Sequence, residues 1–283
     1  MNFSYYPGCS LNSTAVEYDA SLRAVMAALD VGLQELEDWN CCGASSAHSV
    51  NRALSLALPA RNLALAQQAE RDVVMPCAAC FNQHKTAEHA LRTNGGQRAL
   101  VEDAVGFEYT GAVAVRSLLD VVANEIGLAQ VEARVERPLA GLNVVGYYGC
   151  LLVRPPEVTQ FENPEHPTLM DQLLSALGAV VCPWSYATDC CGGGVSLIKP
   201  DMAARLVNRL AARAREAGAE AMVTSCPLCQ VNLEMRQTGT QQPLPIFYFT
   251  ELMGLAFDLK EAQSWWPKHL IDPRRLLQKL GLH

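Results

Sequence analysis

Ten of the eleven cysteines in this 283-residue chain form two copies of one spacing pattern. Each copy has a leading cysteine, a Cys-Cys-Gly triplet and a Cys-x-x-Cys pair, and thirty-four residues separate the Cys-Cys pair from the Cys-x-x-Cys pair in both. Thiolates are the ligands of soft metals and iron–sulfur clusters. The repeat therefore predicts two metal centres, one on Cys9, Cys41, Cys42, Cys77 and Cys80, and the other on Cys150, Cys190, Cys191, Cys226 and Cys229.

Five thiols in each copy are one more than a common metal site uses. Zinc takes four ligands, and an ordinary cubane cluster takes four cysteines. Either one cysteine is spare, or one thiolate bridges two irons in an unusual cluster. The adjacent cysteines favour the bridging arrangement, because the glycines Gly43 and Gly192 relax the backbone enough for both neighbours to face one cofactor.

The cysteine repeat reflects a duplication of roughly half the chain, since the second Cys-Cys-Gly and Cys-x-x-Cys lie 149 positions after the first. In each half, short apolar runs alternate with helical patterns, and the cysteines follow the apolar runs. The carboxyl ends of strands are where open α/β sheets place their sites. We predict two Rossmann-like, doubly wound α/β domains, residues 1–137 and 138–283. Expected strands are 33–36, 73–75, 142–148, 179–181 and 221–224; expected helices are 14–30, 47–69, 113–126, 167–177, 196–217 and 247–257.

Composition excludes several classes of protein. The net charge of −7, without clusters of Lys or Arg, argues against nucleic acid as a partner. The N-terminus does not resemble a secretory signal, and there is no apolar run of about 18 residues that would predict a membrane span. The cysteines are therefore expected in the reducing cytoplasm, where metal ligation is favoured over disulfides.

These motifs resemble the cysteine-rich CCG family, and among its members the B subunit of heterodisulfide reductases. The resemblance covers essentially the whole chain. It implies that each set of five cysteines holds a non-cubane [4Fe-4S]-type cluster, that the clusters face each other across the interface of two domains related by pseudo-two-fold symmetry, and that a disulfide is cleaved between them. It also implies a ferredoxin-like iron–sulfur partner subunit and a flavin-containing one. Similar subunits occur in sulfur-oxidising complexes and in some succinate dehydrogenases.

Several residues outside the cysteine sets are further candidates. Lys199 and His48, a few residues beyond the two Cys-Cys-Gly triplets, are candidate proton donors, and Arg154 is a candidate cation for an anionic substrate. The alternative for Lys199 and His48 is an ordinary surface residue at a helix start. The eleventh cysteine, Cys182, is either a small buried residue or an extra thiol near the second centre. Residues 264–283, with their two tryptophans, suggest a docking tail for a partner, and peripheral membrane association would then come through that partner.

Three functions compete on these residues. The first is a catalytic subunit that reduces or forms a disulfide or persulfide and exchanges electrons with partners, since the chain has no G-x-G-x-x-G nucleotide motif. The second is a non-catalytic electron-relay or quinone-linked subunit in which one motif holds zinc or nothing. The third is a metal-free dithiol oxidoreductase, in which the constant spacing to the Cys-Cys pair would have no use.

Overall fold

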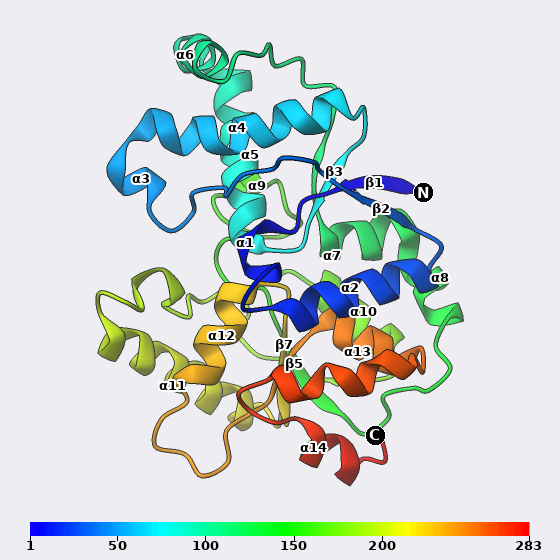
Figure 1. The fold of residues 1–283 in the computed structure, drawn as a ribbon. Coiled ribbons are helices and arrows are strands. Elements are labelled where there is room, and N and C mark those ends of the chain that lie inside the picture. The colour runs from blue at the N-terminus through cyan, green and yellow to red at the C-terminus, as the bar shows by residue number, and fades with distance from the viewer. Residues whose placement is uncertain (283) are drawn as a thin grey trace.

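A computed structural model describes residues 1–282 of the chain, and only the backbone of His48. The first half runs β1 (Asn2–Tyr5), α1 (Gly8–Leu11), α2 (Val16–Ala28), β2 (Gly32–Glu35), α3 (Ala47–Val50), α4 (Arg52–Gln68), β3 (Val73–Met75), α5 (Ala78–Thr93), α6 (Gly95–Val105), β4 (Val115–Ser117), α7 (Leu118–Asp120), the π-helix η1 (Val121–Gly127) and α8 (Leu128–Ala133). Figure 1 shows this half stacked on the second half.

The second half repeats the order of the first and adds a C-terminal segment. It runs β5 (Asn143–Tyr147), α9 (Pro156–Thr159), α10 (Leu169–Ala176), β6 (Val180–Val181), η2 (Gly193–Val195), α11 (Pro200–Glu216), β7 (Ala221–Thr224), α12 (Pro227–Met235), β8 (Ile246–Tyr248), α13 (Phe249–Ala256), η3 (Lys260–Ser264), η4 (Trp266–Lys268) and α14 (Arg274–Lys279). No helix among residues 1–282 is long and apolar enough to cross a membrane.

Each half contains one parallel four-stranded sheet, and the two sheets have the same strand order. The orders are β2-β1-β3-β4 and β6-β5-β7-β8, with every described pair parallel. The central strands β3 and β7 are buried along their whole length, as expected for parallel strands covered by helices on both faces. The duplicated α/β architecture is confirmed.

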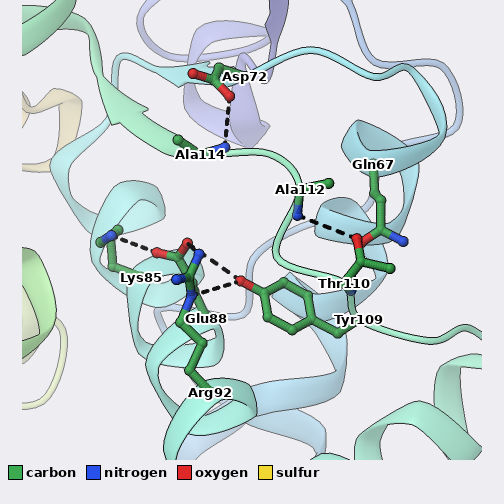
Figure 2. Close-up of polar contacts among 9 residues, drawn as sticks. All are labelled: Gln67, Asp72, Lys85, Glu88, Arg92, Tyr109, Thr110, Ala112 and Ala114. Atoms are coloured by element: carbon green, nitrogen blue, oxygen red, sulfur yellow. Dashed lines mark hydrogen bonds and ion pairs between the residues drawn. The ribbon is translucent and has the colours of Figure 1, made fainter.

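The fourth strand of each sheet was not predicted. The segments 113–126 and 247–257 were expected to be helices, but each begins with a three-residue strand, β4 or β8, before its helix starts. Both segments are rich in apolar residues, and each strand runs into its helix without an intervening loop, so no break in the pattern separates strand from helix. The loop before β4 is held by side chains in Figure 2, where the Asp72 carboxylate accepts a hydrogen bond from the Ala114 amide at 2.8 Å.

The halves pack with approximate two-fold symmetry. Helix α2 of the first half lies against α13 of the second, and its counterpart α10 lies against α7, η1 and α8 of the first half. Likewise α1 contacts α12, and α9 contacts α5. Each helix contact across the interface thus has a counterpart in which the two halves are exchanged. As a result, the corresponding strand ends of the two sheets lie towards a common interface.

Candidate metal centres

The strand order brings the cysteines of each half together. Cys9 follows β1 and Cys77 follows β3, and the order of strands reverses between these two neighbours, which is the usual ligand position in such folds. The Cys-Cys-Gly segment follows the next strand, β2. The sulfur of Cys42 lies 3.4 Å from that of Cys80, and in the second half Cys191 lies 3.6 Å from Cys229.

The glycine of each Cys-Cys-Gly triplet has two structural roles. Gly43 and Gly192 adopt φ of +75° and +80°, values that side chains rarely permit. A methyl group at Gly43 would lie 2.7 Å from Cβ of Ala47, so there is also no space for one. The amide of Gly43 donates to the sulfur of Cys41 at 3.5 Å, and that of Gly192 donates to Cys190 at 3.3 Å. The same turn therefore lets two adjacent cysteines belong to one set and supplies a hydrogen bond to the sulfur of the first.

Helix N-termini lie at the Cys-x-x-Cys pairs but not directly after the Cys-Cys-Gly triplets. Cys77 and Cys226 are the N-cap residues of α5 and α12, so the Cys-x-x-Cys thiols lie at the positive ends of helix dipoles. Helices were also expected directly after Cys-Cys-Gly, and the helix 196–217 was expected to begin at Ser196. The long helices α4 and α11 begin only at Arg52 and Pro200, after the short α3 and η2. In α11, a proline at the first helical position sets the later start.

A tyrosine beside each cysteine set joins the strand to the Cys-Cys-Gly loop. The hydroxyl of Tyr6 donates to the carbonyl of Asn40 at 2.9 Å, and that of Tyr147 donates to the carbonyl of Asp189 at 2.6 Å. Asn40 and Asp189 immediately precede the two Cys-Cys pairs. Burial, followed by the charges of four thiols of the adjoining set, raises the pKa of each tyrosine. The sequence contained this signal, since both tyrosines lie three residues before a leading cysteine.

The two cysteine sets meet at the interface between the halves. The thiols of Cys77 and Cys226 lie close enough to each other that the Cys226 thiol raises the pKa of Cys77. Beside them, the buried hydroxyl of Tyr18 lies 3.2 Å from the carbonyl of Pro76 and 3.1 Å from that of Ser225. These carbonyls precede Cys77 and Cys226, so one side chain contacts both ligand loops. Tyr18 also stacks on Tyr248 of the other half with ring centroids 4.0 Å apart.

Each set is buried on one side and open on the other. Cys42, Cys77 and Cys80 are buried, as are Cys191, Cys226 and Cys229, whereas Cys9, Cys41 and Cys190 are exposed and Cys150 is partly exposed. Hydrogen bonds from Cys41 and Cys80 lower the pKa of Cys42 to about 3, and one from Cys150 lowers that of Cys190 to about 6. A thiolate at Cys42 or Cys190 is thus stabilised by protonated neighbours, because the same hydrogen bonds, followed by burial, raise the pKa of Cys41 and of Cys150. Each set can be reached from solvent through its exposed or partly exposed cysteines.

The donor set fits the iron–sulfur groups expected from the sequence. All eleven cysteines are free thiols. The buried hydroxyl of Ser225, next to Cys226, has no hydrogen-bond partner among the described residues, as suits a residue beside a group with acceptor atoms. Within residues 1–282, no three Cys, His, Asp or Glu side chains already surround a single metal-ion position.

The other predicted residues have varied surroundings. Lys199 is exposed at the N-cap of α11, and the backbone of His48 lies in α3, while its side chain is outside what the structure describes. Arg154 makes a two-point ion pair with Glu165 at 2.7 and 2.8 Å, and its amide donates to the carbonyl of Cys150. Cys182 is buried, and burial followed by the charge of Glu220 raises its pKa.

Two features of the site region differ from what the sequence suggested. The tryptophans that suggested a docking tail, Trp265 and Trp266, are buried in the chain's own core and offer no surface to a partner. His84 was not among the predicted site residues, but its ring is fully buried behind the first set, 2.7 Å from the carbonyl of Cys80 and 3.1 Å from the amide of Asn62. A lone histidine within a helix gives no sequence signal of such a position.

Both cysteine motifs lie in segments that match a known protein family. Residues 3–85 and 144–234 match the family described as CCG, Cysteine-rich domain. The chain is 32% identical, over 97% of its length and 98% of the relative's, to the 8-methylmenaquinol:fumarate reductase membrane anchor subunit of Wolinella succinogenes. It is 26% identical, over 98% of its length and 96% of the relative's, to the B subunit of the ferredoxin/F(420)H(2)-dependent CoB-CoM heterodisulfide reductase of Methanosarcina acetivorans.

A solved structure supports the fold alone. The crystal structure of a hypothetical protein from Helicobacter pylori superposes with a TM-score of 0.74 at 9% identity. That match covers 96% of this chain and 52% of the other, so this chain spans about half of that protein. The two segments matched by the family include all ten motif cysteines. The chain belongs to the CCG cysteine-rich domain family.

Proposed function

We propose that this CCG-family chain is the iron–sulfur subunit of a larger reductase and that it cleaves or forms a disulfide or persulfide between two cysteine sets. The observation that supports this most directly is the proximity of Cys77 and Cys226, whose preceding carbonyls share the Tyr18 hydroxyl, because it brings the two sets to one interface while each stays open to solvent on its other side. The relatives named as the B subunit of heterodisulfide reductases add support for a sulfur substrate.

The ten motif cysteines are the proposed ligands, five to each of two non-cubane [4Fe-4S]-type clusters. Once bound, such clusters would supply the substrate with electrons one at a time. Reduction of a disulfide takes up two electrons and two protons, breaks the S–S bond and yields two thiols. The electrons are proposed to come from a ferredoxin-like iron–sulfur subunit and a flavin-containing subunit, because the chain carries no nucleotide-binding motif of its own.

The remaining candidates have roles in binding and proton supply. Lys199 and His48 follow the two Cys-Cys-Gly turns and are proposed to deliver the protons. Arg154 follows Cys150 and is proposed to attract an anionic substrate, which would have to replace Glu165 as the partner of its guanidinium. That exchange is feasible because both side chains of the ion pair are well exposed to solvent.

A second candidate function is electron exchange with a quinol at a membrane surface. The relative at 32% identity is named for 8-methylmenaquinol and as a membrane anchor subunit, and the similarity covers nearly all of both chains. In this case the cysteine sets would relay electrons and no disulfide would be cleaved. One half could then hold zinc or no metal, which the disulfide-cleaving function does not allow.

Metal content of anaerobically purified protein tests the proposal first. Two four-iron clusters require about eight iron and eight sulfide per chain, and Cys42→Ser and Cys191→Ser should each remove about half. Cys182→Ser is the matched control and should keep the full content, because Cys182 lies outside both sets. About one zinc per chain, or iron for one cluster only, would contradict the two-cluster proposal and favour the relay. With two clusters present, reoxidation of the reduced protein by a disulfide or by a menaquinone analogue then separates the two functions.

A further inference from the structure

The segment after the second Cys-Cys-Gly triplet exposes bulky apolar side chains. Leu197 and Ile198 are 93% and 81% exposed, the highest values for large apolar residues in the described part of the chain. They lie between η2 and α11, directly before Lys199. Side chains of this size and exposure are unfavourable in water and commonly mark a surface that another apolar phase covers.

Further exposed apolar residues extend this segment into one surface. The loop crosses α12: a methyl group at Gly193 would lie 3.0 Å from Cγ of Leu228, and Arg236 donates to the carbonyl of Ser196 at 3.1 Å. The members share exposure of at least a third and come from this loop, the first turn of α11 and α12. We call this set the apolar loop surface: Val195, Leu197, Ile198, Met202, Leu228 and Met235.

The apolar loop surface adjoins the second cysteine set. Leu228 lies between Cys226 and Cys229 in sequence, and the loop itself continues from Cys190, which is exposed. Whatever covers the surface therefore lies next to the open side of the second proposed centre.

Cations border the surface. Lys199 and Arg205 are exposed on or beside the loop, and Arg236 is partly exposed beneath it; Asp201 is the acid among them. Large apolar side chains beside Lys and Arg are the combination that inserts into the headgroup region of a membrane with anionic lipids. The chain as a whole has a net charge of −7, so this local excess of cations contrasts with the remaining surface.

The first half shows that the cysteine motif does not require such a surface. The positions 149 residues before Leu197, Ile198 and Lys199 are His48, Ser49 and Val50, so the first half has neither the apolar pair nor the lysine. Both halves nevertheless bring five thiols together. The loop is thus a property of one half only, as expected for a molecule that presents one side to a membrane.

We propose that the apolar loop surface inserts into the headgroup region of an anionic lipid bilayer and places the second cysteine set at the membrane surface. This inference deepens the quinol-linked candidate function, because a quinol is dissolved in the lipid phase. A protein partner on the same surface is the alternative that the experiment must distinguish.

Vesicle co-sedimentation of the purified full-length chain tests the proposal without any redox reaction. Vesicles of phosphatidylcholine with a quarter phosphatidylglycerol should sediment most of the wild-type protein, and pure phosphatidylcholine vesicles should sediment several-fold less. Leu197→Asp combined with Ile198→Asp should reduce binding at least tenfold, and Lys199→Glu should weaken it and reduce its dependence on salt. Val50→Asp, in the corresponding segment of the first half, is the matched control and should bind like wild type.

Wild-type protein that stays in the supernatant with both vesicles would overturn the proposal. So would a folded Leu197→Asp/Ile198→Asp variant that still binds vesicles but no longer co-purifies with its partner subunits, since the surface would then serve a protein contact. Circular dichroism checks that the variants are folded. Because this assay uses neither quinol nor disulfide, its failure would leave the metal-content and reoxidation results standing.

Discussion

The two halves differ in charge at a pair of equivalent positions on the domain interface. In the second half, Glu234 of α12 and Glu251 of α13 hold His269 between them, with N–O distances of 2.9 and 2.8 Å and all three side chains buried. The corresponding residues of the first half are Lys85 on α5 and Asp120 on α7, and they line a cavity of about 220 Å³.

The first half pairs its charges in a different way. Lys85 is bound to Glu88, which also contacts Arg92 and Tyr109, as Figure 2 shows. Asp120 is bound to Arg116. No first-half element corresponds to the segment that carries His269, because that segment follows the end of the repeat. Equivalent places in the two halves thus have different charge arrangements. In the second half a buried ion cluster with His269 lies where the first half has a cavity.

The largest expected effect comes from removing the central cation of that cluster. His269→Leu would leave two buried carboxylates without their shared partner, and breaking a buried ion pair in this way costs about 3–5 kcal/mol. Denaturant unfolding at pH 7 measures the loss. Asp120→Asn, at the first-half position equivalent to Glu251, breaks a more exposed pair with Arg116 and should cost about 1 kcal/mol or less. Equal losses of unfolding free energy in the two variants would show that the two charge arrangements contribute equally to stability.

The stabilisation by His269 should also depend on pH. Its two carboxylate neighbours outweigh the effect of burial and raise its pKa to about 11. In the unfolded chain the pKa is about 6.5. Because the folded value is the higher one, the stabilisation is complete below about pH 6.5 and declines as the pH rises towards 11.

The difference in unfolding free energy between wild type and His269→Leu, measured from pH 8 to 10.5, isolates this effect from other alkaline titrations. The difference should shrink steadily across that range. Glu17 does not confound it, because burial and the charge of Glu251 raise the pKa of Glu17 only to about 7. A difference that stays constant up to pH 10.5 would mean that His269 is neutral in the folded protein.

The contact between the halves at Tyr18 gives the next smaller effect. Tyr18→Phe removes the one donor shared by the carbonyls of Pro76 and Ser225, and leaving buried acceptors unpaired costs about 1–3 kcal/mol. Tyr248→Phe is the matched control, because its hydroxyl makes only a 3.5 Å contact to Gln230. In cluster-free protein, oxidative cross-linking of Cys77 to Cys226 should slow in Tyr18→Phe and not in Tyr248→Phe. Unchanged cross-linking in both would rule out a positioning role for Tyr18.

The sequence predicted the duplicated cysteine sets and most of the strands, and it missed single residues that act between distant segments. The repeated spacing located the cysteine sets, and apolar runs located five of the eight strands. Strand β1 was not predicted, although its counterpart β5 was. His269 and Tyr18 each act across long separations, and a single polar residue in an apolar segment carries no periodic signal. The strands β4 and β8 were missed for another reason: a three-residue strand that runs into a helix without an intervening loop cannot be distinguished from the first turn of that helix.

The smallest effect tests the symmetric part of the molecule. Tyr6 and Tyr147 occupy equivalent positions and donate to equivalent carbonyls, so Tyr6→Phe and Tyr147→Phe should each cost about 1 kcal/mol, the usual net contribution of one hydrogen bond. Thermal unfolding of the two variants is the measurement. Similar losses would place the asymmetry of the molecule in its interface and surface loops and not in the ligand scaffolds. If one variant loses several times more, the two cysteine sets are not held alike, and separate roles for the two proposed centres would follow from the scaffold itself.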